Sequence, residues 1–433
     1  MNVRNKTNTE LKQKANAFGM VLYHCAKENR DRKFHALYDK VYRPDILKAA
    51  WNKVKSNRGS SGIDGQTIEY IKYELTERKF LNQLYLKLKN DEYKPSAVRR
   101  VYIPKDNGDK RPLGIPTIED RVVQQAMRSV IEPIFEADFK DCSYGFRPNR
   151  NAHDAIKMIK KASRKNYWVV DVDIKGYFDN INHDKLIKLV EKRISDKRII
   201  KMIRGWLKAG VLENGELEST PLGSPQGGVI SPLLANIYLN YLDTIWQNQF
   251  SHLGTLIRYA DDMVILTSQK RTAIESIRVL KTVFSRLELE MNLEKSKLVN
   301  IWDNKEGFDF LGLHHRKFKV LKPGGKEMHF LQSIPSKKAM RKMKATFKAY
   351  ISPRNRLFWQ LEDFIPGLNR KVVGMRNYYK LSSIGDRWLA KIDRYIIELL
   401  TLHHNKRRNH HRKRAELKEI VERTKRFGLE KFV

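Results

Sequence analysis

The sequence predicts an α+β fold in which antiparallel strands are followed by a purely helical segment. Strand-length apolar runs recur between residues 98 and 266, separated by stretches with helical periodicity. From Pro335 to about His404 the pattern changes to three helical runs, with breaks expected near Ser352-Pro353, Pro366-Gly367 and Ser382 to Gly385. A chain of 433 residues is long enough for about two or three such domains.

The chain is strongly basic along its whole length. It has 85 Lys plus Arg against 49 Asp plus Glu, a net charge of +36. Because 41% of the residues are hydrophobic, the chain can bury sizeable cores, so the charge belongs to folded surfaces. A polyanion bound along an extended groove is therefore the favoured class of partner.

Cysteine content and hydropathy bear on the cellular compartment. Cys25 and Cys142 are too few for a disulfide framework or a four-thiolate zinc site, which favours a reducing environment. The longest uncharged stretch, residues 219–242, contains three prolines, so no transmembrane helix is expected. The basic N-terminus includes Glu10 and lacks an apolar core, which argues against a secretory signal. We expect a cytosolic or organelle-matrix protein.

The first helix of the folded region is expected at residues 46–54, where apolar residues share one face. A loop at residues 57–65 follows, with three glycines in seven residues beside Arg58. It is either a surface turn or a flexible lid whose backbone amides, with Arg58 and Gly59, approach phosphates. Both interpretations stay open.

Two later segments combine cations with strand or loop patterns. Residues 98–104 alternate apolar and basic side chains, including Arg99 and Arg100, and residues 113–116 run back after a turn, which predicts a basic β-hairpin. After a helix at residues 119–135, the loop at residues 143–150 holds two arginines and two aromatic rings. Arg147 there could stack on bases or fasten the loop to the core, and both alternatives remain.

Acidic residues occur on two apolar strands. In residues 167–174 the period of two places Asp171 and Asp173 on one face, and in residues 258–266 Asp261 and Asp262 fall where a hairpin would turn. Carboxylates in buried strands are unfavourable unless a cation accompanies them. A divalent ion explains them most simply, since Mg²⁺ takes a few carboxylates and leaves its remaining ligand positions to water and phosphate.

Together, Tyr259-Ala260-Asp261-Asp262 and the segment from Asp173 to Ile181 resemble the palm of a reverse transcriptase. The chain is similar, more specifically, to the bacterial group II intron-encoded reverse transcriptase/maturase. The matching motifs continue in the same order over nearly the whole chain: residues 58–65, 99–116, 144–149, 224–228, 292–297 and 308–312.

The resemblance implies a right-hand polymerase with fingers and palm built on antiparallel sheet. Its expected domains are an N-terminal extension with the lid loop at 1–85, fingers and palm at 86–332, a helical thumb/maturase (X) domain at 333–404, and a short basic DNA-binding tail at 405–433. The four histidines between residues 403 and 411 do not predict a zinc site, because no cysteine lies near them. An apolar stripe in the thumb, Ile365, Leu368, Val372 and Met375, favours helix core over RNA contact.

The resemblance also assigns roles. Asp173, Asp261 and Asp262, with the carbonyl of Ile174, would hold two Mg²⁺ ions. Nucleotide contacts would come from Lys105, Arg111, Phe178 and Gln226, the Phe178 ring excluding a 2′-hydroxyl. Contacts to nucleic acid would come from Arg58, Gly59, Arg99, Arg100, Arg147, Lys295, Arg376, Tyr378, Arg407 and Arg408.

The function implied is an RNA-directed DNA polymerase that binds its group II intron RNA, assists splicing and copies the RNA into cDNA during retrohoming. Its partners would be dNTPs, a primer–template duplex and target DNA, in a cytoplasmic, nucleoid-associated ribonucleoprotein, with monomer and homodimer both open. No paired-cysteine HNH endonuclease segment is present, so the primer is expected from a nicked or replicating target. The alternatives are a splicing-only maturase and a domesticated enzyme of phage defence or DNA repair.

Overall fold

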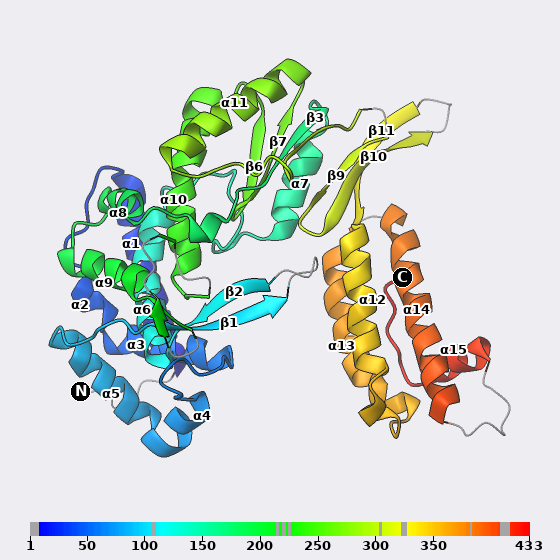
Figure 1. Cartoon of the computed structure of the whole chain (residues 1–433), viewed down its shortest axis with the longest axis horizontal. Helices are drawn as coiled ribbons and strands as arrows, with labels where there is room; N and C mark the ends of the chain where they lie inside the picture. Colours follow the sequence, from blue (N-terminus) through cyan, green and yellow to red (C-terminus); the bar gives the residue numbers. More distant parts are fainter. Residues whose placement is uncertain are drawn as a thin grey trace. The chain divides into compact units, whose positions relative to one another are not determined.

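The computed structural model describes residues 8–104, 110–213, 216–218, 222–223, 227–302, 305–321, 327–381, 383–407 and 416–433. Helices and strands both occur up to residue 335, and among the described residues only helices follow (Figure 1), which confirms the α+β class. The chain divides into two compact units. Unit 1 comprises Met1–Asn151, Val172–Met263 and Ile274–Ser296, and unit 2 comprises Ala152–Asp171, Val264–Ala273 and Lys297–Val433.

Unit 1 is organised around helix α6 (Ile118–Glu136), which is buried along most of its length. Its N-cap Thr117 accepts a hydrogen bond from the Asp120 amide at 3.0 Å, which satisfies one free donor of the first turn. Helices α1 (Asn8–Glu28), α2 (Tyr38–Val41), α3 (Pro44–Ser56) and α10 (Ser231–Ile245) pack against it. The other helical segments of this unit are α4 (Ile68–Tyr70), η1 (Ile71–Leu75), α5 (Glu77–Lys89), η2 (Tyr177–Asp179), α8 (His183–Glu191), α9 (Lys197–Lys208) and η3 (Trp246–Phe250).

The predicted basic hairpin is confirmed in unit 1. Strands β1 (Val98–Pro104) and β2 (Lys110–Ile115) pair antiparallel, with Arg100 opposite Gly114. They form a four-stranded sheet with β4 (Val211–Glu213) and β5 (Glu216–Glu218), in the order β2-β1-β4-β5. The tip of the hairpin, with Lys105, lies outside the described residues.

A second four-stranded sheet carries the acidic strands, in the order β6-β7-β3-β8. Its strands are β3 (Trp168–Val172), β6 (Thr255–Tyr259), β7 (Asp262–Thr267) and β8 (Lys297–Asn300). Both β3 and β7 cross the division between the units. Their apolar residues are buried, as continuous apolar strands should be. Helices α7 (Ala152–Ala162) and α11 (Lys270–Arg286) complete this part of the chain.

Unit 2 contains the antiparallel strands β9 (Gly307–Phe310), β10 (Leu313–Leu321) and β11 (Glu327–Pro335), in the order β11-β10-β9. A bundle follows, with α12 (Lys337–Ile351), η4 (Arg354–Arg356), α13 (Leu361–Tyr379), α14 (Ser383–Arg407) and α15 (Leu417–Arg426). None of the described helices is long and apolar enough to cross a membrane.

Two of the three breaks expected in the helical segment are present, and one prediction is wrong. Pro366 and Gly367 lie inside α13 instead of interrupting it. A proline this near a helix start removes only one intrahelical hydrogen bond, and the buried Phe364 and Leu368 on either side keep the helix packed. The predicted apolar stripe is confirmed as core, since Leu368 and Val372 are fully buried.

The structure does not separate a C-terminal tail at residue 405. Residues 408–415 lie outside the described part, but Ile420 and Phe432 belong to the same core as α12, α13 and α14. The Phe432 amide donates to Asp393 Oδ1 at 3.0 Å, and Arg376 pairs with Glu430 at 2.7 Å. The high content of Lys and Arg in this segment favoured a separate basic tail. However, α15 is amphipathic, and its apolar face packs into the helical core. Residues 416–433 are therefore part of the helical domain.

Candidate active site

The predicted catalytic carboxylates lie at the ends of strands in unit 1. Asp173 directly follows β3, Asp261 occupies the turn between β6 and β7, and Asp262 is the first residue of β7. Asp261 is half-buried, whereas Asp262 is exposed. The turn is strained, because Ala260 has a φ of 58°, a left-handed backbone value that residues other than glycine rarely adopt. Strain of this kind is typical of functional turns.

Three charged side chains, Asp173, Arg111 and Arg258, affect the pKa of the Asp261 carboxyl. Burial raises the pKa of Asp261, and the negative charge of Asp173 adds to this increase. The Asp261 backbone amide and the cations of Arg111 and Arg258 oppose it. Two predicted residues of distant segments, Asp173 and Arg111, are thus close enough to act on Asp261. A bound cation would favour the ionised form of both carboxyls.

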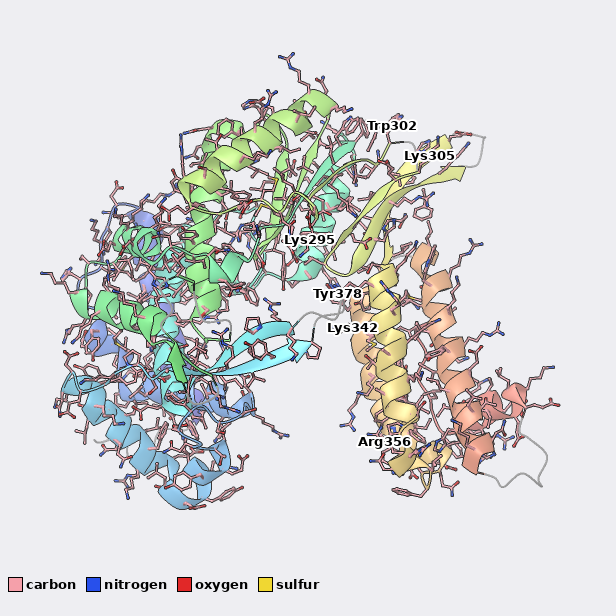
Figure 2. The ribbon with its side chains drawn as sticks, viewed as in Figure 1. Lys295, Trp302, Lys305, Lys342, Arg356 and Tyr378 are labelled. Atoms are coloured by element: carbon pink, nitrogen blue, oxygen red, sulfur yellow. The ribbon has the colours of Figure 1, made fainter. Side chains whose placement is uncertain are left out.

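Asp173 is held by the segment that contains Lys295. The Asp173 amide donates to Ser296 Oγ at 3.1 Å, and the Asn292 amide donates to the Asp173 carbonyl at 2.8 Å. The Lys295 ammonium lies 3.9 Å from Asp173 Oδ2. The label in Figure 2 marks this lysine before β8. The resemblance assigns Lys295 to nucleic-acid contacts, and the structure places it beside Asp173, a predicted metal ligand.

The donor atoms suit a hard cation, but they do not form a complete cage. Carboxylates of Asp173, Asp261 and Asp262 and the Ile174 carbonyl offer only oxygen, the donor that Mg²⁺ prefers. Within the described ranges, no group of three His, Cys, Asp or Glu side chains is arranged to hold a metal ion alone. Mg²⁺ commonly completes its octahedral shell with water and substrate phosphate, so the residues present fit a site shared with a nucleotide.

Phe178 occupies a fixed and half-exposed position in η2, after Gly176, which has a φ of 52°. Its ring meets the ring of Tyr177 edge-on, with 5.3 Å between the centroids. Tyr177 is buried and donates its hydroxyl to the Ala235 carbonyl at 2.6 Å. The Phe178 ring is thus in contact with a buried neighbour and partly open to solvent.

Of the other nucleotide contacts predicted, Arg111 is described and Lys105 and Gln226 are not. Arg111 lies on β2 opposite Ile103. Gly227, next to Gln226, packs on β2, where an added Cβ would contact the Gly114 carbonyl and would lie 3.0 Å from Leu113 Cδ1. Gly227 therefore lies against β2, the strand that carries Arg111.

The glycine loop at residues 57–65 is fastened to the start of α6. A Cβ at Gly62 would lie 2.6 Å from the backbone of Thr117, so only glycine permits this approach. Arg121 donates to the carbonyls of Pro116 and Ser60, and Arg99 donates to the Ser61 carbonyl at 2.8 Å. The sequence analysis did not assign a role to Arg121, which fastens this loop. Its position as a cation within an otherwise apolar helical segment could have indicated one.

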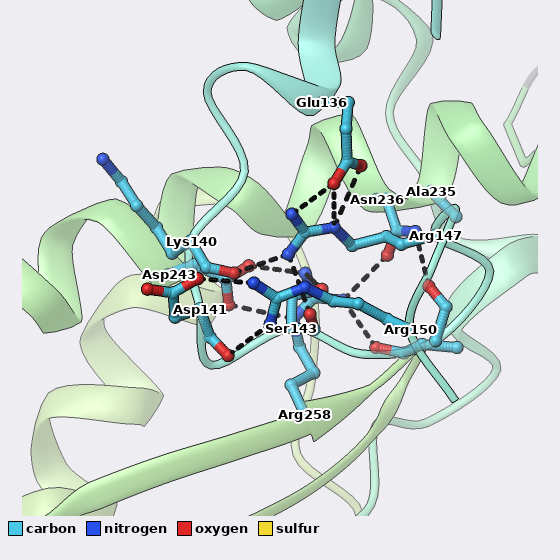
Figure 3. Close-up of polar contacts among 12 residues, drawn as sticks. Glu136, Lys140, Asp141, Ser143, Arg147, Arg150, Ala235, Asn236, Asp243 and Arg258 are labelled. Carbon is cyan, nitrogen blue, oxygen red and sulfur yellow. Dashed lines mark hydrogen bonds and ion pairs between the residues drawn. The ribbon is translucent and has the colours of Figure 1, made fainter. Parts of the chain in front are cut away.

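Arg147 does not reach solvent, so its position does not support the expected contact with nucleic acid. Its side chain is 3% exposed and pairs with Glu136 at 2.6 Å (Figure 3). It also donates to the carbonyls of Lys140 and Ser143. Arg147 fastens its loop, the second alternative, whereas the neighbouring Phe146 is 48% exposed.

The thumb residues singled out from the sequence make contacts within unit 2. Arg376 pairs with Glu430, and Tyr378, labelled in Figure 2, donates its hydroxyl to the Leu311 carbonyl at 2.8 Å. The side chain of Arg407 and all of Arg408 fall outside the described residues. Arg58 and Arg100 belong to the lid loop and to β1.

Comparison with known proteins identifies the family. The family described as "Reverse transcriptase (RNA-dependent DNA polymerase)" matches residues 103–315. "Protein YkfC" of Escherichia coli (strain K12) is 35% identical over 338 residues, covering 69% of this chain and 87% of that protein. "Group II intron-encoded protein LtrA" of Lactococcus lactis subsp. cremoris is 45% identical over 221 residues, covering 50% of this chain and 36% of LtrA.

A shorter match is "Nuclear intron maturase 1, mitochondrial" of Arabidopsis thaliana, 32% identical over 93 residues, or 22% of this chain and 13% of that protein. The chain belongs to the reverse transcriptase family, and within it to the group II intron type of reverse transcriptase/maturase. The matched part spans about a third of LtrA.

Proposed function

We propose that the chain is an active RNA-directed DNA polymerase whose nucleotidyl-transfer centre is formed by Asp173, Asp261 and Asp262. The observation that carries the proposal is the position of Asp261 on a strained turn, close to both the Asp173 carboxylate and the Arg111 cation. The two carboxylates, Asp173 and Asp261, suit the metal ions of a metal–triphosphate complex, and the Arg111 cation suits its phosphates.

The reaction joins the primer 3′-oxygen to the α-phosphate of a dNTP and releases pyrophosphate. Two Mg²⁺ ions, when bound, would lower the pKa of the 3′-hydroxyl and neutralise charge on the phosphates. The carboxylates, with the Ile174 carbonyl, would fix the positions of these charges. Arg111, with Lys105, would bind the triphosphate, and Gln226 would lie beside the nucleotide.

Phe178 would exclude a ribose 2′-hydroxyl from the site. Its ring is backed by the buried Tyr177, so it cannot easily turn away. Positioning by these groups supplies much of the barrier reduction in phosphoryl transfer, so loss of any carboxylate should remove activity and spare the fold.

The proposed RNA partner is the group II intron that encodes such proteins, with splicing assistance and retrohoming as the biological roles. Support comes from the names of the relatives and from the net charge of +36, which favours long contacts with RNA, a primer–template duplex and target DNA. Association with the nucleoid as a ribonucleoprotein is part of the same proposal.

The deciding experiment is primer extension on an RNA template by the full chain with Mg²⁺ and dNTPs. Asp261→Asn is the matched variant, because it removes the charge and keeps the shape. We expect extension by the natural chain and none by Asp261→Asn, with equal RNA binding by both. Equal extension by both would contradict the proposed site. Splicing of intron RNA by Asp261→Asn would separate the maturase role from polymerisation.

A further inference from the structure

A buried ion pair lies directly behind the turn that carries Asp261. Arg258, on β6, and Asp243, on α10, both have side chains with 0% exposure. Arg258 Nε donates to Asp243 Oδ1 at 2.9 Å, and Nη2 donates to Oδ2, which makes the pair bidentate (Figure 3). Burial alone would lower the pKa of Arg258, but the Asp243 carboxylate outweighs it and raises this pKa. The pair therefore stays charged.

Every N–H group of the Arg258 guanidinium is used. Beyond the two bonds to Asp243, Nη2 donates to Ser143 Oγ at 2.8 Å and Nη1 donates to Asn236 Oδ1 at 3.1 Å. The fifth bond runs from Nη1 to the carbonyl of Ala260 at 2.8 Å. Ala260 is the left-handed residue immediately before Asp261, so this bond fixes the strained peptide on which the carboxylate depends.

The turn is also in contact with Gly145. A Cβ at Gly145 would contact the Ala260 nitrogen and would lie 2.9 Å from the Tyr259 carbonyl carbon, so the two backbones touch. The Gly145 carbonyl accepts a hydrogen bond from Asn236 Nδ2 at 2.8 Å. The side-chain amide of Asn236 thus bonds to both Arg258 and Gly145, and both of these residues contact Ala260.

A buried ion pair is weak evidence for stability, because apolar residues of similar volume often serve a core equally well. What a guanidinium offers instead is a rigid planar fork with five directional donors. Here one donor binds the Ala260 carbonyl, and the other four bind Asp243, Ser143 and Asn236 and so hold the guanidinium in place. Small displacements of catalytic groups lower reaction rates strongly, so a fixed carbonyl beside Asp261 is important for the proposed chemistry.

We propose that Arg258, oriented by Asp243, is a positioning residue for nucleotidyl transfer: it fixes the Ala260 peptide and thereby sets where the Asp261 carboxylate holds its metal ion. This inference rests on the proposed polymerase function and adds to it a residue that touches neither substrate nor ion. Its signature is a changed response to Mg²⁺ with unchanged binding of nucleic acid.

The same loop supplies a matched control. Arg147 is also buried, also pairs with a carboxylate, Glu136, and also donates to Ser143, through the carbonyl. Within the described part of the chain, its hydrogen bonds go to Glu136, Lys140 and Ser143, and none goes to residues 259–262. Arg147→Lys therefore removes a guanidinium from the same loop and deletes none of the five hydrogen bonds of Arg258.

The test compares Arg258→Lys with Arg147→Lys in the full chain. Single-nucleotide extension is measured across Mg²⁺ concentrations at saturating primer–template and dNTP. We expect Arg258→Lys to lower the maximal rate about 10- to 100-fold and to raise the Mg²⁺ concentration for half-maximal rate several-fold. Its primer–template affinity should match the natural chain, and Arg147→Lys should keep the natural Mg²⁺ midpoint.

Natural kinetics in a folded Arg258→Lys would overturn the positioning role and leave the polymerase function standing. Failure of the natural chain to extend any primer would overturn both. If circular dichroism shows that Arg258→Lys does not fold, Gly145→Ala replaces it, since this change leaves the Arg258–Asp243 pair in place and puts a methyl group against the Ala260 nitrogen. The same rise in the Mg²⁺ midpoint supports the proposal, and an unchanged midpoint overturns it.

Discussion

The ammonium group of Lys295 lies 3.9 Å from the carboxylate of Asp173, at the surface of unit 1. The lysine side chain is 68% exposed, so water and salt screen this pair and its contribution to stability is small. A cation placed beside a proposed metal ligand is instead available to a phosphate, which carries the opposite charge.

We expect Lys295→Ala to reduce primer extension several-fold without changing the unfolding free energy by more than about 0.5 kcal/mol. Lys175→Ala is the control, since Lys175 forms a similar exposed pair with Glu290 at 3.4 Å. Steady-state extension and urea unfolding measure the two quantities. Equal effects of both variants on extension would show that Lys295 contributes only general surface charge.

Sugar selection should depend on Phe178. Phe178→Ala removes the ring that we propose excludes the 2′-hydroxyl, so incorporation of ribonucleotides should rise relative to deoxynucleotides. Phe178→Tyr retains a ring and should keep the natural preference. Single-nucleotide extension with each dNTP and rNTP pair measures the ratio, and an unchanged ratio in Phe178→Ala would assign selection to another side chain.

The C-terminal residues should be needed for the stability of the helical domain. Phe432 is fully buried and meets Phe347 edge-on at 6.2 Å, so Phe432→Ala should cost about 3–5 kcal/mol. Phe427→Ala, at a position 37% exposed, is the control and should cost much less. Denaturant unfolding followed by circular dichroism is the measurement. Equal costs would mean that residues 416–433 do not complete the core.

Stability should decrease in mild acid because of His315. Burial lowers the pKa of His315 to about 4, and His314 and Lys160 act in the same direction, while Asp309 opposes them. With this pKa the ring is neutral in the folded state near pH 7; Nε2 donates to the Phe310 carbonyl at 3.3 Å, and Nδ1 lies 3.0 Å from Ser333 Oγ. Between about pH 6.5 and 4 the unfolded chain therefore binds more protons, so stability rises with pH across this window.

His315→Gln should lose this component of the pH dependence. The expected contribution reaches about 3 kcal/mol between neutral pH and pH 4. Urea unfolding at a series of pH values measures it for both chains. Parallel curves for the two chains would show that other groups cause the acid sensitivity.

Local patterns in the sequence were sufficient for much of the fold. The β1–β2 hairpin and the turn at Asp261 follow from alternation and turn residues, which act over a few positions. The resemblance supplied the roles of the carboxylates, and the structure places Asp173 and Arg111 beside Asp261.

Contacts between distant residues were not predictable in this way. The partner of Arg258 is 15 positions away on another element, and Phe432 packs beside Asp393, 39 positions away. From composition alone, Arg258 and the C-terminal cations were assigned to the charged surface. Whether a cation faces solvent or a buried carboxylate depends on the packing of whole elements, which a local pattern does not contain.

Unit 1 is assembled from three stretches of chain, the last of which ends at Ser296. Leu280, Val283 and Phe284 of this last stretch are buried, and the Tyr238 hydroxyl donates to the Leu287 carbonyl. During synthesis, Tyr238 therefore gains this hydrogen-bond partner only after residue 287 has left the ribosome. Early termination before that point would release a nascent chain with exposed apolar surface, so we infer that translation speed and chaperone access influence the yield of active protein.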